Sequence, residues 1–112
     1  MIFEIRNYHF DPARLDDYRV WATDLAVPHL KAELDVVGFW ISTADEPEIT
    51  GAPHDDLGTA NVTWILRWED LKTRSETMER VFSSDRWKEI FAQVPGGRAS
   101  YRRTESKFAA ET

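Results

Sequence analysis

The sequence predicts an α+β fold in which one four-stranded antiparallel sheet carries helices on one of its faces. Two observations support this prediction. Four stretches typical of strands and two amphipathic helical stretches follow one another in the order strand, helix, strand, strand, helix, strand. The helices have enough apolar residues to cover one face of the sheet, which leaves a second, tryptophan-rich face bare. We therefore expect that the protein is not a monomer.

The length of 112 residues, with 42% hydrophobic and 30% charged residues, is typical of a single soluble domain. We expect this domain to span residues 1–108 and the last residues, 109–112, to fray. The chain has no cysteine, which excludes a disulfide framework, a thiolate metal site and a cysteine nucleophile. The longest apolar run, residues 36–41, is too short for a bilayer, and the first strand begins directly after Met1. We therefore expect no signal peptide and a cytoplasmic protein.

The net charge of −6 also limits the partners. A negative surface repels nucleic acid phosphates and anionic membranes alike. We expect neither nucleic acid nor a membrane as a partner.

The first strand covers residues 2–9, and the first helix begins after it at Asp11-Pro12, an N-cap carboxylate followed by a proline at the first helical position. An apolar stripe then follows at helical spacing: Leu15, Tyr18, Ala22 and Leu25. Pro28 is expected to kink or end this helix, because its ring clashes with the carbonyl four residues earlier.

The second strand, residues 36–43, begins with a run that is apolar on both of its alternating sets. This pattern predicts cover on both faces, either as a central strand or through a dimer. Residues 44–58 form an acidic loop longer than a hairpin requires, and loops of this size are usually lids or disordered. The third strand covers residues 61–68.

The second helix is capped by Asp70 or Glu69, and a second cap at Ser84 starts a short helical piece. The apolar stripe of the second helix consists of Leu71, Met78, Val81 and Phe82. The last strand, residues 98–108, has few large apolar residues, which is typical of an edge strand or of one with a wet face.

The order β-α-β-β-α-β is the ferredoxin-like plan, with both helices on one side of the sheet. Joining two bare sheet faces buries on the order of 800 Å² per subunit, near the standard size of a specific interface. At about 25 cal/mol per Å², the gross gain is roughly 20 kcal/mol per subunit, set against the cost of association. We expect a homodimer; a lid from the same chain is the alternative.

Several short motifs together resemble the NIPSNAP family over nearly the whole chain. They are Ile2-Phe3-Glu4-Ile5-Arg6-Asn7-Tyr8 followed by Asp11-Pro12, then Val37-Gly38-Phe39-Trp40, Trp68-Glu69-Asp70-Leu71 and Ser84-Asp85-Arg86-Trp87. The resemblance implies a dimeric α+β barrel, in which two ferredoxin-like subunits pair their sheets around a shared interior. Proteins with this fold include cofactor-independent monooxygenases, isomerases and cyclases, so the fold alone names no reaction.

Three polar residues of the first strand, Glu4, Arg6 and Tyr8, alternate with Phe3 and Ile5. If Phe3 and Ile5 face the helices, the three polar side chains face the barrel interior. There they can bind an anionic or enolic ligand, with Arg6 as a bidentate clamp and Tyr8 as a donor. In the alternative interpretation, Glu4 and Arg6 form cross-strand ion pairs and Tyr8 caps the core.

Three tryptophans lie on the two strands expected to form a hairpin: Trp40, Trp64 and Trp68. Aromatic walls suit a flat or apolar ligand, but tryptophans also fill cores and anchor interfaces. Asn7 is a further candidate wall residue. His29, near the end of the first helix, is either a general base at the cavity mouth or a partner of the helix C-terminus. The histidine spacing and the absence of a glycine-rich phosphate loop predict neither a metal nor a cofactor.

The leading hypothesis is a homodimeric barrel that binds a small, largely apolar molecule in its interior. The polar contacts are Glu4, Arg6 and Tyr8, and the ligand-binding walls include Trp40, Trp64, Trp68 and Asn7. Whether the protein is an enzyme stays open. As an oxygenase, isomerase or cyclase it would use Arg6 and Tyr8 to stabilise an enolate, and Glu4 or His29 to take the proton. The alternative is a non-catalytic carrier or an interaction module whose sheet face serves only dimerisation.

Overall fold

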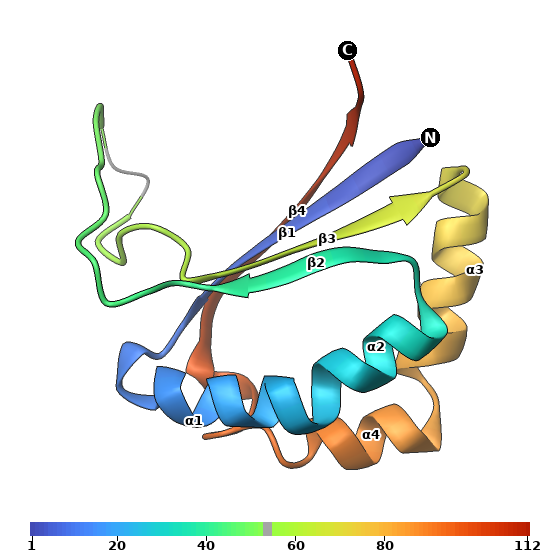
Figure 1. Ribbon diagram of the computed structural model, residues 1–112, viewed down its shortest axis with the longest axis horizontal. Helices are drawn as coiled ribbons and strands as arrows, with labels where there is room; N and C mark the ends of the chain where they lie inside the picture. The colour runs from blue at the N-terminus through green and yellow to red at the C-terminus, as the bar shows by residue number, and fades with distance from the viewer. Residues whose placement is uncertain (53–54) are drawn as a thin grey trace.

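A single antiparallel sheet forms one layer of the molecule, and all its helices form a second layer on one side of it (Figure 1). The computed structural model describes residues 1–52 and 55–112. The strands are β1 (Ile2–Phe10), β2 (Val36–Ile41), β3 (Val62–Trp68) and β4 (Tyr101–Ala110), in the spatial order β2-β3-β1-β4. The helices are α1 (Leu15–Trp21), α2 (Val27–Glu33), α3 (Leu71–Phe82) and α4 (Asp85–Phe91). The predicted α+β fold with its ferredoxin-like order is confirmed.

Pro28 widens the first helical segment without ending it. Between α1 and α2 the residues Ala22–Ala26 form a π-helical turn, and the segment continues to Glu33. Proline has no N–H to bond to the carbonyl four residues earlier, and its ring crowds that carbonyl. The N–H of Val27 instead donates to the carbonyl of Ala22, five residues back. The helical segment therefore accommodates the proline with one wide turn and continues beyond it.

The caps of α3 and α4 lie where their sequence signals place them. The Asp70 carboxylate accepts a hydrogen bond of 2.7 Å from the N–H of Thr73. The Ser84 hydroxyl oxygen accepts one of 3.2 Å from the N–H of Trp87. Each bond satisfies a backbone donor that has no partner within its own helix, so the two helices begin at fixed points.

β2 lies at the edge of the sheet and is not central, although its apolar sequence is typical of a covered strand. Its side chains on the face opposite the helices, which we name the open face, are exposed: Val37 to 48% and Trp40 to 51%. Gly38 lies beside the Trp40 ring, and a Cβ atom on Gly38 would collide with that ring. The glycine therefore leaves room for the indole along the strand.

β4 is the other edge strand, as its polar sequence indicates. It is longer than expected, because Ala109 and Ala110 pair with Phe3 and Ile2 of β1. The strand begins at Tyr101 and not at residue 98, because Arg98–Ser100 form a 3-10 turn before it.

The two sets of β1 side chains face the opposite way from the expected assignment. Glu4 and Tyr8 are buried beneath the helices, whereas Phe3 and Ile5 lie on the open face and are only partly buried. Because cross-strand partners share a face, Trp64 and Trp68 of β3 also point toward the helices. The polar set is thus enclosed between the sheet and the helices, and the partly apolar set lies on the open face.

The loop between β2 and β3 rises on the open-face side of the sheet (Figure 1). Arg103 of β4 fixes part of it through bonds of 2.7 Å to Asp55 and 3.1 Å to the carbonyl of Gly58. Pro53 and His54 lie outside the described residues. No described residue of this loop lines the cavity between sheet and helices. The loop therefore does not cover this cavity with any described residue, and its expected role as a lid stays a prediction that concerns only the open face.

Candidate functional site

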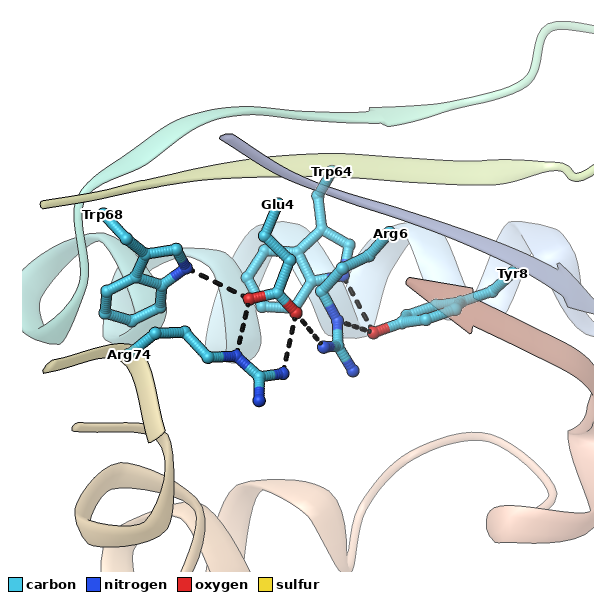
Figure 2. A network of polar contacts seen from close by, with 6 residues as sticks. All are labelled: Glu4, Arg6, Tyr8, Trp64, Trp68 and Arg74. Carbon is cyan, nitrogen blue, oxygen red and sulfur yellow. Dashed lines mark hydrogen bonds and ion pairs between the residues drawn. The ribbon is translucent and has the colours of Figure 1, made fainter. Parts of the chain in front are cut away.

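A fully buried carboxylate, Glu4, lies at the centre of a network between β1, β3 and α3 (Figure 2). Arg74 of α3 donates to both of its oxygens over 3.0 Å, through Nε and Nη2. Arg6 donates from Nη1 over 2.6 Å, and the indole N–H of Trp68 donates over 3.0 Å. The Glu4 carboxylate thus accepts four hydrogen bonds, which is the arrangement that a buried charge requires.

This network keeps Glu4 ionised. Burial by itself raises the pKa of a carboxyl, but the hydrogen bonds and positive charges of Arg74 and Arg6 outweigh it and lower the pKa of Glu4 below its usual value. A carboxylate with a lowered pKa and no free oxygen is a poor proton acceptor. Glu4 is therefore placed to hold Arg6 in position, and its expected role as a base finds no support here.

Arg6 connects the carboxylate to a phenol. Its Nε–H donates to the hydroxyl oxygen of Tyr8 over 2.6 Å, and the indole N–H of Trp64 donates to the same oxygen over 3.0 Å. The guanidinium also lies over the Trp64 ring, 5.4 Å from its centroid. Burial lowers the pKa of Arg6, but the nearby Tyr8 oxygen and Glu4 carboxylate raise it overall, so its positive charge persists.

A cavity of about 330 Å³ opens beside this network, between the sheet and the helices. Arg6, Tyr8 and Trp64 form part of its wall on the sheet side. The other lining residues are mostly aromatic or aliphatic: Tyr18, Trp21, Ala26, Leu30, Phe39, Phe82, Trp87, Phe91 and Tyr101, with Arg98 and Thr104 as further polar members. The volume is at the lower end of the range for small-molecule sites, and suits a ligand of one or two rings.

The buried Tyr18 and the partly buried Tyr101 complete the apolar wall. Tyr101 lies edge-on to Tyr8, with ring centroids 5.6 Å apart, and nearly parallel to Phe91 at 6.0 Å. Burial raises the pKa of both Tyr18 and Tyr101 above the ordinary value of a phenol. Both stay neutral at physiological pH and act as hydrogen-bonding, flat walls.

The structure brings five of the candidate residues together and separates three. Glu4, Arg6, Tyr8, Trp64 and Trp68 belong to one network, as Figure 2 shows. The other three lie elsewhere. Asn7 is on the open face and accepts a bond of 2.6 Å from Thr63, and Trp40 is exposed on the same face. His29 does not line the cavity.

His29 contacts a residue of the cavity wall. Its ring stacks on Trp87 with centroids 6.3 Å apart, and its buried Nε2 has no hydrogen-bond partner among the described residues. Trp87 lines the cavity and His29 does not, so a direct part of His29 in proton transfer finds no support from this position.

Arg74 and Phe39 are the functional neighbours that the sequence does not reveal. Arg74 comes from the first half of α3, and only the packing of that helix against the start of β1 brings it to Glu4. Phe39 lies on β2 against the Trp64 ring, at 5.7 Å between centroids. Both contacts join residues far apart in sequence, and no local motif signals them.

The described residues contain neither a candidate metal cluster nor a membrane-spanning helix. Residues 1–52 and 55–112 contain no cluster of three or more histidine, aspartate or glutamate side chains arranged to hold a metal ion. Over the same residues, no helix combines the length and the apolar character that crossing a membrane would need.

Comparison with known proteins identifies the fold. No family model and no curated protein matches the chain by sequence. Among solved structures, a NIPSNAP family protein of unknown function from Agrobacterium tumefaciens (Atu4242) is 22% identical, with a TM-score of 0.74 over 97% of this chain and 86% of that one. An uncharacterised NIPSNAP domain protein from Burkholderia xenovorans is 18% identical, with a TM-score of 0.74 over 100% of this chain and 95% of that one.

A more distant structural match is named after an activity. A structure described as an antibiotic biosynthesis monooxygenase is 11% identical, with a TM-score of 0.57 over 100% of this chain and 99% of that one. Identities this low establish a shared fold and no shared activity. The chain therefore has, over its whole length, the fold of NIPSNAP family proteins, which its sequence motifs predict.

Proposed function

We propose that this protein binds a small, flat and largely apolar molecule in the cavity between the sheet and the helices of each subunit. One observation carries the proposal. The Tyr8 oxygen already accepts hydrogen bonds from Arg6 and Trp64, so the Tyr8 hydroxyl hydrogen must point away from both donors. Because Tyr8 and Arg6 line the cavity, this hydrogen is available to an oxygen atom of a ligand.

The cavity wall supports the apolar part of this proposal. Phe39, Trp64, Trp87, Phe91 and Tyr101 contribute ring faces or edges to one space. Small-molecule sites are typically apolar with a few fixed polar groups, which is the composition found here. Arg6 is fixed from behind by Glu4, so a ligand meets a donor pair that needs little rearrangement on binding.

Binding without proton abstraction is the form of the proposal that the geometry favours. Among the described residues that line the cavity, none is a carboxylate or an imidazole, and those are the usual general bases. Arg6 and Tyr8 are both donors toward the ligand, which suits recognition of an oxygen or stabilisation of negative charge on it.

The proposal includes a homodimer formed through the open face. Trp40 and Val37 are exposed there beside the partly buried Phe3, Ile5 and Ile65. An apolar patch on one sheet face, at an edge strand, is a typical interaction surface. In this proposal, dimerisation and ligand binding use opposite faces of the same sheet, so each is testable without the other.

The test uses the separate indole N–H signals of the tryptophans in ¹H–¹⁵N correlation spectra. The purified protein is titrated with one- and two-ring alcohols, ketones and carboxylates. We expect at least one probe to shift the signals of Trp64 and Trp87, which line the cavity, and to leave that of Trp40 unchanged. Binding confined to Trp40, or no binding below about 1 mM by any probe, contradicts the proposal.

A matched pair of variants on β4 controls this test. Thr104 and Ser106 are both exposed and both point to the helix side, because they pair with Tyr8 and Arg6, but only Thr104 lines the cavity. We expect Thr104→Trp to obstruct the cavity and weaken binding at least about tenfold, and Ser106→Trp to bind like the wild type. Equal behaviour of the two variants would place the bound probe elsewhere.

A further inference from the structure

The buried network has one more positive charge than negative charge, and the excess lies at the cavity wall. Glu4 is its single carboxylate, whereas Arg6 and Arg74 are both cations. Arg74 matches the carboxylate directly, since it donates to both Glu4 oxygens over 3.0 Å. Arg6 bonds only one of those oxygens, and Arg6 is the one that lines the cavity. The surplus charge therefore faces the ligand space.

No acidic side chain balances Arg6 from the rest of the wall. Among the described residues that line the cavity none is an aspartate or a glutamate, and Arg98 adds a second cation. Arg98 is exposed, and its guanidinium lies 5.1 Å from the centroid of the Phe91 ring. The chain as a whole has a net charge of −6, so the sign of the cavity is opposite to that of the protein.

Arg6 also keeps donors that the protein does not use. A guanidinium has five N–H groups, of which Tyr8 takes the one on Nε and Glu4 takes one on Nη1. Within the described residues, no hydrogen bond involves the remaining three, which lie on Nη1 and Nη2. Two adjacent guanidinium nitrogens with free N–H groups match the two oxygens of a carboxylate.

From these observations we infer that the ligand is a small aromatic anion whose charged oxygens bind Arg6 and the Tyr8 hydroxyl. The inference rests on the proposed function and specifies its ligand class. Arg6 and Arg74 share Glu4 as their counter-ion, and an anionic ligand supplies the second negative charge that this partly buried pair of cations lacks. The flat rings of Trp87, Phe91 and Tyr101 then enclose the aromatic part, within a cavity of about 330 Å³.

The experiment compares two probes of equal shape and different charge, 2-naphthoate and 2-naphthamide, by isothermal titration calorimetry at neutral pH. Hydrogen bonds to an ionised acceptor are roughly twice as strong as those between neutral groups. We expect the carboxylate to bind at least about tenfold more tightly than the amide. The amide, which keeps the ring system, is expected to retain measurable binding through the aromatic walls.

Two arginine variants locate the source of this preference. Arg6→Gln is expected to reduce the preference for the carboxylate to less than about threefold. Arg98 is exposed at the cavity wall, so Arg98→Gln is expected to fold normally. We expect this variant to bind the carboxylate about two- to fivefold more weakly and the amide with unchanged affinity. Arg102→Gln is the control, since Arg102 is also exposed but pairs with Asp11 and does not line the cavity.

The outcomes distinguish failure of the anionic ligand class from failure of the proposed binding function. Equal affinity for the naphthoate and the naphthamide, or tighter binding of the amide, overturns the anionic ligand and leaves the proposed binding function standing. Absence of binding by both, together with no shift at Trp64 or Trp87 from any neutral probe, rejects the proposed function itself. If Arg6→Gln does not fold, unchanged carboxylate affinity in Arg98→Gln relative to Arg102→Gln decides against the inference.

Discussion

The Nε–H of Arg6 donates to the hydroxyl oxygen of Tyr8 over 2.6 Å, and the two residues are neighbours on one face of β1. A strand places side chains two positions apart on the same face, so this contact is local in sequence. Two further residues hold this pair in place: Glu4 bonds the Arg6 guanidinium, and Trp64 bonds the Tyr8 hydroxyl oxygen.

Replacing Tyr8 with phenylalanine tests this arrangement. The ring is kept, but the N–H groups of Arg6 and Trp64 lose their shared acceptor. We expect the free energy of unfolding to fall by about 1–3 kcal/mol and carboxylate affinity to fall about tenfold. Chemical denaturation and calorimetry measure the two effects. Unchanged affinity in a folded Tyr8→Phe protein would remove Tyr8 from the binding site.

Replacing Glu4 with glutamine tests the buried charge. The variant leaves two arginines without a carboxylate, and we expect the free energy of unfolding to fall by about 3–5 kcal/mol. Glu33→Gln is the control, because the Glu33 carboxylate belongs to an exposed ion pair with Arg80 and is expected to contribute less than about 1 kcal/mol.

The lowered pKa of Glu4 also predicts the direction of the pH dependence. The folded state binds the Glu4 proton more weakly than the unfolded state does, so this contribution is fully present above the unfolded pKa, near 4.5. It is lost as the pH falls through the lower, folded pKa. Unfolding measured between about pH 3 and pH 7 is expected to show a smaller acid loss in Glu4→Gln than in the wild type. Parallel profiles would show that other carboxylates dominate.

Arg74 is expected to matter more than an arginine of similar type on the surface. Arg74→Ala removes both hydrogen bonds that α3 makes to the buried Glu4, and we expect a loss of about 2–4 kcal/mol in the free energy of unfolding. Arg80→Ala, on the same helix, removes only the exposed pair with Glu33 and is expected to cost less than about 1 kcal/mol. Similar losses in the two variants would mean that Glu4 does not depend on α3.

The open face is tested through Trp40. A carboxylate in place of this half-exposed indole introduces charge into an apolar patch, so we expect Trp40→Glu to be monomeric where the wild type is a dimer. Val20→Glu is the control, since Val20 is 60% exposed on α1, in the helical layer. Sedimentation velocity distinguishes the species. A wild-type monomer at micromolar concentration would refute the proposed interface but not the cavity, which lies within one subunit.

The order of the elements was predictable because it depends on local signals. Alternation of apolar residues marks the strands, and the caps Asp70 and Ser84 mark the starts of α3 and α4. Each of these signals involves residues only a few positions apart, so it is recognisable in a single sequence without knowledge of the tertiary structure.

The face assignment of β1 was not predictable in the same way. Both alternating sets contain apolar residues. In the set that is buried, the Glu4 carboxylate is matched by Arg74 of α3, a residue far away in the sequence. The edge position of β2 has a similar cause. The open face of β2 is apolar, which is typical of a strand covered on both faces. A central strand and an edge strand covered by another chain have the same apolar sequence pattern, so the sequence alone does not distinguish them.

The wide turn that accommodates Pro28 sets the rotational phase of the long helical segment. In a straight α-helix each residue advances by 100°, so Tyr18 and Leu30 would point about 120° apart around the axis. The turn at Ala22–Ala26 takes up one extra residue and cancels most of that rotation. Tyr18 and Leu30 consequently reach the same cavity wall. Straightening this turn into a regular α-helix without removing a residue would rotate everything after it by roughly 100°, away from the ligand space.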